Sequence, residues 1–314
     1  MKKKFIITID TEGDNLWADR VTRNGPKAIT TENAQNLERF QILCEQYGFI
    51  PVYLTNYEMS KAQPFTELAQ CALKKGRAEI GMHMHAWNSP PIENLPYNHK
   101  GGHAYIGEYS RRLQWEKMKY LTKHLEDIFQ EPITSHRSGR WWFDEFILKC
   151  LKRLGYLVDC TMTPYESWKS SIGNREYGID YSKDIYRGEY MLSNRNIHAS
   201  GNSGVYEVPP TILRHYKYDF PILHRTTEWF RPNGNNLEEM LWIKEKVRKN
   251  KKVDYLQFML HSSELTAGTN PTFKYKNSIE KLYSDLKILF DEVSKDFEGI
   301  GITRYIKEKH ICQK

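Results

Sequence analysis

Short apolar segments alternate with longer amphipathic segments along most of the chain, and this alternation predicts strands separated by helices. The apolar segments are rich in β-branched and aromatic residues, which is typical of strands. The predicted strands are residues 5–10, 50–55, 78–83, 133–137, 157–160, 205–208, 255–260 and 299–303.

The amphipathic segments repeat their apolar residues at helical spacing. Leu37, Phe40 and Cys44 fall on one face of such a segment, and Gly48 is expected to end that helix. The predicted helices are residues 31–47, 65–75, 109–129, 143–154, 237–247 and 278–293, with a short helix after residue 303.

Strands joined by helices of this length pair in parallel. The order of elements therefore predicts an α/β fold, a distorted (β/α) barrel of about seven to eight mostly parallel strands. Residues 88–107 form a polar loop, and an irregular insertion is expected at about 161–204, where no periodicity is sustained. Because no linker rich in Ser, Pro or Gly divides the chain, residues 1–314 are expected to form a single domain.

The net charge of the chain adds little to the predicted fold. The chain carries 46 Lys and Arg against 39 Asp and Glu, a formal charge of +7. The densest basic cluster, from Lys244 to Lys252, falls at a helix end, where cations are favoured. No stripe of basic residues interleaved with aromatic ones is present, so nucleic-acid binding is not expected.

The cysteines and the N-terminal residues indicate the cellular compartment in which the protein is expected. The 5 cysteines show no metal-ligand spacing and are expected to be reduced thiols. Three lysines precede the apolar residues 5–9, as at the start of a signal peptide, but Asp10 and Glu12 interrupt the apolar run early. No segment has the apolar length of a membrane span. We therefore expect a cytoplasmic protein, of unspecified oligomeric state.

Ionisable residues stand at the carboxyl ends of the predicted strands, the edge at which β/α barrels carry their catalytic groups. They are Asp10, His83, Arg137, Asp159 and His261, with Glu12 and His85 just beyond.

Part of this set is typical of a metal site. A carboxylate and two imidazoles commonly bind a divalent ion. His83 and His85 share one face of an extended segment, so both rings can reach an ion that is also bound by an acid near Asp10 or Glu12. The alternatives are that Glu12 is a turn or capping residue and that the histidines are ordinary core or surface residues.

The other residues suit proton transfer. Arg137 can hold a catalytic carboxylate ionised, although it could equally form a structural ion pair. His261 can protonate a leaving group if it is not simply a core histidine, and Asp159 is the carboxylate expected to orient it. Glu207 and Glu264 are weaker candidates.

Tryptophans in the loops provide a further pattern. Trp87, Trp141 and Trp142 follow the candidate residues and could stack on sugar rings or belong to the core. His103 is a looser candidate in the polar loop.

Together these stretches resemble the polysaccharide deacetylase superfamily and its NodB-homology barrel. The resemblance covers about residues 5–303 and is weakest across 165–200. The stretches that carry it, in order, are Ile-Thr-Ile-Asp-Thr-Glu-Gly-Asp from Ile7, Glu-Ile-Gly-Met-His-Met-His-Ala-Trp from Glu79, His-Arg-Ser-Gly-Arg-Trp from His136, Val-Asp-Cys-Thr-Met-Thr-Pro from Val158 and Phe-Met-Leu-His-Ser-Ser-Glu-Leu from Phe258.

The resemblance implies a role for each proton-transfer residue. Asp10 would be the catalytic base, tethered by Arg137. His261 would be the general acid, supported by Asp159.

It also implies a metal site, with Glu12 and His83 as ligands and zinc as the expected ion. The family usually places its second histidine four residues after the first, where this chain has Trp87, so His85 is assigned by reach. The second acid of the first motif is Glu instead of Asp, and the third motif lacks its usual proline. The sequence thus looks like a divergent branch.

The implied function is a metal-dependent hydrolase that removes an acyl group, an N- or O-acetyl, from a carbohydrate or a surface-polysaccharide precursor. One alternative is a catalytically inactive barrel that binds a glycan or a partner protein. Another is an amidohydrolase that acts on a small non-sugar amide.

Overall fold

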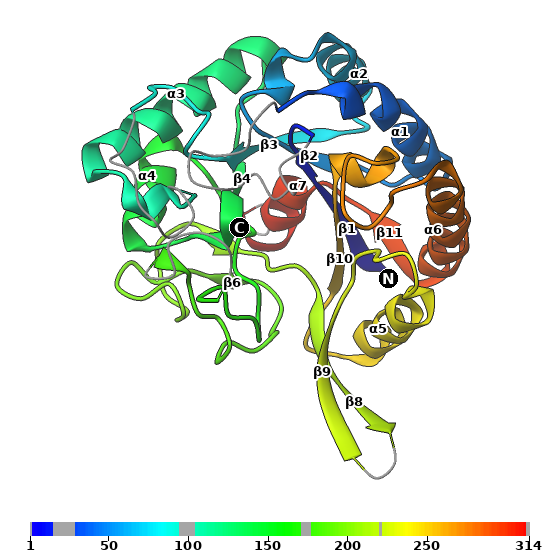
Figure 1. Cartoon of the computed structure of the whole chain (residues 1–314). Coiled ribbons are helices and arrows are strands. Elements are labelled where there is room, and N and C mark those ends of the chain that lie inside the picture. Colours follow the sequence, from blue (N-terminus) through cyan, green and yellow to red (C-terminus); the bar gives the residue numbers. More distant parts are fainter. Residues whose placement is uncertain (1, 15–28, 94–103, 171–176, 220–221, 312–314) are drawn as a thin grey trace.

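A curled, mostly parallel sheet forms the centre of the molecule, and helices α1, α2, α5 and α6 lie in an arc around its outside (Figure 1). The computed structural model describes residues 2–14, 29–93, 104–170, 177–219 and 222–311. The strands of the sheet run in the order β10-β1-β2-β3-β4-β5-β7-β6, and β11 pairs with β1. Their bounds are β1 Lys3–Thr11, β2 Pro51–Thr55, β3 Glu79–Met84, β4 Ser135–Ser138, β5 Val158–Asp159, β6 Tyr190–Met191, β7 Tyr206–Glu207, β10 Tyr255–His261 and β11 Phe297–Gly299.

Within this sheet β6 pairs antiparallel with β7, and the other ladders are parallel. The helices are α1 Leu37–Gln46, α2 Gln63–Lys74, α3 Arg111–Phe129, α4 Glu145–Leu154, α5 Leu237–Lys249, α6 Lys276–Asp296 and α7 Ile302–Ile306. The predicted α/β fold, a distorted barrel of mostly parallel strands, is confirmed. The helix predicted at 31–47 begins as a 3₁₀ helix, Glu32–Asn36, which leads into α1.

The segment that follows β7 meets the edge strand β10 through a few hydrogen bonds in place of a ladder. After β7 the chain reaches β10, where Thr211 N donates to Gln257 O at 3.3 Å and Gln257 N donates to Thr211 Oγ1 at 2.9 Å. Tyr255 Oη donates to Pro209 O at 2.9 Å. The barrel is therefore only partly closed at this seam.

Aromatic rings fill the layer between β1 and the outer helices. Phe5 packs edge-on against Phe49 and Phe290, with ring centroids 4.7 and 5.9 Å apart. All three rings are buried. Burial of each such side chain stabilises the fold by roughly 1.5–3 kcal/mol. This packing fixes the strand whose far end carries Asp10.

The strand predicted at 299–303 is wrong in its position. Strand β11 ends at Gly299, and α7 begins at Ile302. The carboxylate of Glu79 accepts hydrogen bonds from Thr303 N and Thr303 Oγ1 at this helix start. A carboxylate satisfies the free N–H groups of a first helical turn, so the apolar run continues as a helix.

The structure contains a long hairpin that the sequence pattern did not predict. Strands β8, Ile212–Asp219, and β9, Ile222–Trp229, form a separate antiparallel sheet that projects from the rest of the molecule (Figure 1). In the segment predicted as an irregular insertion, the described residues form β6 and two isolated bridges, Ser167–Asp180 and Leu192–Ser200.

No helix of the described residues is long and apolar enough to cross a membrane. The described cysteines are free thiols, of which Cys44, Cys150 and Cys160 are buried and Cys71 is exposed. Cys312 and His103 lie outside the described residues.

Candidate metal centre and adjoining proton-transfer residues

The sheet register brings the strand-end residues together at one rim. Asp10 on β1 lies opposite His261 on β10, and His83 on β3 lies opposite Arg137 on β4. All four side chains are buried. The predicted convergence of ionisable groups at the carboxyl ends of parallel strands is thus present in the structure.

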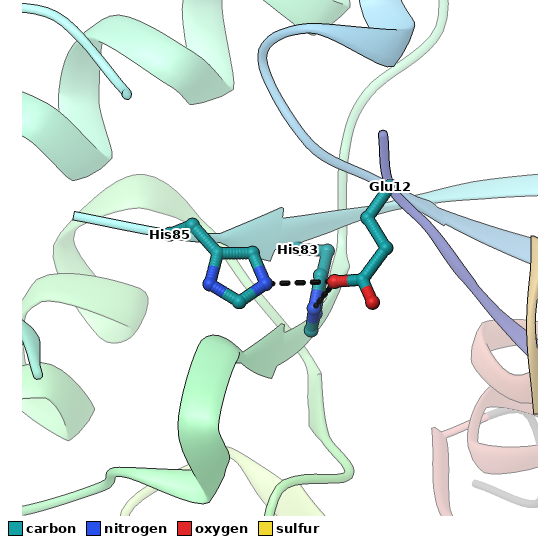
Figure 2. A group of neighbouring side chains, drawn as sticks. All are labelled: Glu12, His83 and His85. Atoms are coloured by element: carbon teal, nitrogen blue, oxygen red, sulfur yellow. Dashed lines mark hydrogen bonds and ion pairs between the residues drawn. The ribbon is translucent and has the colours of Figure 1, made fainter. Parts of the chain in front are cut away.

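Glu12, His83 and His85 form a compact buried cluster (Figure 2). The Oε2 atom of Glu12 lies 3.2 Å from His83 Nε2 and 2.8 Å from His85 Nε2. One ligand atom from each residue lies within 4.8 Å of the other two. Two imidazole nitrogens and a carboxylate oxygen are a donor set that suits zinc and related divalent ions, so this group could hold a metal ion.

The orientation of His83 suits a metal ligand. Its Nδ1 lies 3.0 Å from the carbonyl oxygen of Arg137, which can only accept a hydrogen bond. The Nδ1 proton is therefore directed to the backbone, and Nε2 faces Glu12. Such a contact from the second ring nitrogen is the usual way of orienting a metal-binding histidine.

Opposing effects set the protonation of this cluster. Burial disfavours the charged form of Glu12, but hydrogen bonds from His83 and His85 outweigh it and hold the pKa of Glu12 well below its usual value. Burial also opposes the charge of His83, yet the nearby Asp10 and Glu12 raise its pKa overall. For His85 burial prevails and lowers the pKa. The carboxylate is thus ionised and ready to bind a cation.

The backbone of Glu12 is held from two sides. Glu12 N donates to Ser262 Oγ at 3.1 Å, and this hydroxyl donates to Glu12 O at 2.9 Å. Asn33 Nδ2 donates to the same carbonyl at 2.8 Å. These contacts fix Glu12 beyond the end of its strand.

The ring of His85 is confined between Trp87 and Gly139. Its centroid lies 4.3 Å from that of Trp87. A Cβ atom on Gly139 would lie 2.5 Å from His85 Nδ1 and 2.6 Å from Met84 O, so only glycine leaves room for the ring. Trp87 therefore covers His85, at the position where the resemblance would place a second histidine.

Asp10 is held by Arg137. Arg137 Nη1 donates to Asp10 Oδ1 at 2.6 Å, while Nη2 donates to Thr8 Oγ1 and Nε to Cys160 O. Burial alone would raise the pKa of Asp10, but the guanidinium and the nearby imidazoles lower it. Asp10 is therefore a buried carboxylate that can accept a proton.

His261 points one ring nitrogen into this cluster. His261 Nε2 lies 3.6 Å from Asp10 Oδ2 and 3.8 Å from Glu12 Oε1. On the other side of the ring, Arg231 Nη2 donates to Nδ1 at 3.1 Å, and Glu264 Oε2 accepts from His261 N at 2.8 Å.

The expected pairing of Asp159 with His261 is not found. Asp159 Oδ1 lies 2.6 Å from His136 Nδ1, and Thr161 donates to the same carboxylate. The reason is register, because His136, and not Arg137, lies opposite Asp159 between β4 and β5. Glu207, opposite Asp159 on β7, has a pKa raised well above its usual value by burial and by the charge of Asp159.

The two tryptophans after Arg137 are buried, and Trp141 packs beside Arg137. Trp141 is 8% exposed and Trp142 is 6% exposed. The ring of Trp141 lies 5.3 Å from the guanidinium carbon of Arg137 and stacks at 5.8 Å on Trp168. Arg140 and Trp141 have φ angles of 58° and 56°, a strained conformation for residues with a Cβ.

One contributor was missed by sequence reasoning, and a second was ranked low. Arg231 follows the unpredicted hairpin, and no periodic signal surrounds it. Glu264 was a weak candidate, and its position three residues after His261 matches its role as a local partner of that backbone.

The fold and the rim define an α/β protein with a curled parallel sheet and a buried potential metal centre. No family model matches the chain, and no curated protein sequence matches it. Solved structures do match. A Mycobacterium smegmatis protein assigned to the polysaccharide deacetylases aligns with a TM-score of 0.56 at 13% identity, over 98% of this chain and 91% of that one.

Two enzymes from Thermococcus species share the fold as well. A GH57 branching enzyme of Thermococcus kodakaraensis has a TM-score of 0.53 at 11% identity, over 98% of this chain and 72% of that one. A 4-α-glucanotransferase of Thermococcus litoralis has a TM-score of 0.51 at 9% identity, and this chain spans 38% of its length. At these identities the likeness is one of fold alone.

Proposed function

We propose that the protein is a metal-dependent hydrolase that removes an acyl group, an N- or O-acetyl, from a carbohydrate or a surface-polysaccharide precursor. One observation carries the proposal: the Glu12, His83 and His85 cluster adjoins an arginine-held carboxylate, Asp10, and the imidazole of His261. A potential metal ligand set, a base and an acid are thereby combined at one rim.

Glu12, His83 and His85 would hold the ion, and zinc suits their two nitrogens and one oxygen. The chemistry supplied there by a bound ion would be polarisation of the acyl carbonyl and a lowering of the pKa of water toward about 7. The chain supplies the rest of the environment. Glu12, His83 and His85 are buried, and burial strengthens the electrostatic interactions between them.

The proton transfers follow from the geometry. Asp10, kept ionised by Arg137, accepts a proton from the water whose oxygen bonds to the acyl carbon. The bond from that carbon to the amide nitrogen or ester oxygen then breaks, and His261 donates a proton to the leaving atom. The products are a carboxylic acid and a sugar with a free amine or hydroxyl group.

The carbohydrate substrate is supported by the fold. The solved structures with this fold include a protein assigned to the polysaccharide deacetylases and two enzymes that act on glucans, as their names state. The narrower choice of an acyl group rests on the residues of the rim and on the motif resemblance.

The test is acetate release from acetylated oligosaccharides by zinc-loaded protein, together with metal analysis. Asp10→Asn should abolish turnover and leave zinc binding largely intact. Asp14→Asn is a matched control, since Asp14 lies in the same segment but binds Thr30 and Asn33.

Protein that holds no stoichiometric zinc under replete conditions would point to an inactive binding barrel. Turnover of small cyclic amides without turnover of acetylated sugars would reassign the substrate. Full activity of Asp10→Asn on a proven substrate would refute the role of Asp10.

A further inference from the structure

Arg231 bridges two groups at the edge of the site. It lies two residues beyond Trp229, the last residue of the hairpin strand β9. Its Nη2 donates to His261 Nδ1 at 3.1 Å and to Glu264 Oε1 at 2.6 Å. Glu264 in turn accepts from the backbone N–H of His261 through its other oxygen, at 2.8 Å. Arginine, glutamate and histidine thus form a closed ring of contacts.

The backbone around Arg231 is fixed. Phe230 N donates to Thr211 O at 2.9 Å, and Met259 N donates to Phe230 O at 3.3 Å. Asn236 Nδ2 donates to Arg231 O at 2.8 Å. Because Phe230 is tied to both the start of the hairpin and β10, the guanidinium approaches His261 from a defined direction.

In the contact between Arg231 and His261, only the guanidinium can be the hydrogen-bond donor. A guanidinium carries only donors, so His261 Nδ1 must be the acceptor. In a neutral imidazole the proton then lies on Nε2. That nitrogen is the one directed at Asp10 and Glu12, at 3.6 and 3.8 Å.

The alternative tautomer would break the ring of contacts. A proton on Nδ1 would face the guanidinium, and the acceptor Glu264 Oε2 lies 3.6 Å away, beyond hydrogen-bond distance. Burial opposes ionisation of Glu264, yet the charge of Arg231 lowers its pKa to about 2. The carboxylate is therefore ionised and available to hold the arginine in place.

We propose that Arg231 is a positioning residue that fixes the ring and the tautomer of His261, so that the Nε2–H bond points into the candidate metal centre. The catalytic value of this arrangement rests on the proposed function. The arrangement itself does not. Arg231 and Glu264 thereby take the orienting role that was expected of Asp159, which binds His136.

The direct test is the tautomer of His261, read by ¹⁵N NMR of histidine-labelled, metal-free protein and assigned by the loss of the signal in His261→Gln. The wild type should show an unprotonated Nδ1 and a protonated Nε2. Arg231→Met should shift the population toward the Nδ1–H form, while Arg231→Lys, which keeps a donor, should restore part of the wild-type signal.

The matched control is Arg214→Lys. Arg214 also joins the hairpin to the body, through Ser182 O and the ring of Tyr165, but it has no role in the candidate site. It should leave the His261 signal unchanged. A wild-type ring protonated at Nδ1, or a wild-type tautomer in Arg231→Met, would overturn the proposal.

Kinetics add an independent readout. On a substrate that the wild type hydrolyses, Arg231→Met should lower kcat by about 10- to 100-fold, the usual effect of removing an orienting partner, with little change in KM. An unchanged kcat would overturn the positioning role. If the wild type hydrolyses no acylated sugar, the proposed function fails, whereas the NMR comparison still decides the role of Arg231.

Discussion

Arg137 on β4 donates to Asp10 on β1 at 2.6 Å, across the interior of the curled sheet, although β2 and β3 stand between the two strands in sheet order. The pair is buried on both sides, with Arg137 fully enclosed and Asp10 only 2% exposed. A charged contact of this kind ties opposite parts of the rim together and sets the protonation of Asp10.

Replacement of Arg137 by Met should destabilise the protein strongly. The change leaves Asp10 as a buried charge without its cation, which costs about 3–5 kcal/mol. Urea unfolding of the metal-free protein measures this loss. The double variant Asp10→Asn with Arg137→Met should lose less than the sum of the single variants, because the two groups interact. Additive losses would show that the pair is not coupled.

Glu207 should make the stability depend on pH. Its folded-state pKa is raised, so its contribution to stability is fully present below its unfolded pKa of about 4.3 and is lost as the pH rises through the folded value. The slope for one proton is at most about 1.4 kcal/mol per pH unit. Glu207→Gln mimics the protonated group and should flatten the profile. Parallel curves for both proteins, from denaturant unfolding between pH 5 and pH 8.5, would contradict this assignment.

Gly139→Ala should displace the ring of His85, because the added Cβ would lie 2.5 Å from Nδ1. We expect zinc affinity, measured by competition with a chromogenic chelator, to fall by about tenfold or more. Gly48→Ala is a control for a general loss of stability. Gly48 has a φ of 67° and open space around it, so its substitution strains the backbone away from the site and should leave zinc affinity unchanged.

Zinc should stabilise the wild type by mass action, by about 2.7 kcal/mol at a free concentration of 100 times Kd. Glu12→Gln removes the ionised ligand and should abolish most of the shift in Tm that zinc produces. Asp14→Asn should retain it, since Asp14 contacts Thr30 and Asn33 and neither histidine. Equal shifts in the two variants would exclude Glu12 as a ligand.

The sequence predicted the rim well because its signals are local. Strands β1 and β10 are buried along most of their length, so they appear as continuous apolar runs whose ends are easily located. The rule that barrel chemistry lies at strand ends then selects Asp10, His83 and His261. The spacing of His83 and His85 predicted that both rings face one point, but it left open whether Asp10 or Glu12 meets them there.

The partners of these residues were harder to predict. His136 and Arg137 are neighbours in the chain, and only the register decides which of them meets Asp159. Likewise, Arg231 reaches His261 from just beyond a hairpin that lies outside the main sheet, and no apolar periodicity in the sequence predicts its position. Contacts between distant side chains depend on strand pairing, which the hydrophobic pattern of one chain does not specify.

The position of β1 between β10 and β11 has a consequence for folding. The first strand of the chain pairs with two of its last, so Ser262 reaches Glu12 across a separation of 250 residues. Contacts this remote in sequence slow folding, because the chain must close a long loop before they form. During synthesis Glu12 leaves the ribosome long before Ser262, the residue that holds its backbone, does. The rim can therefore be completed only after β10 has been synthesised.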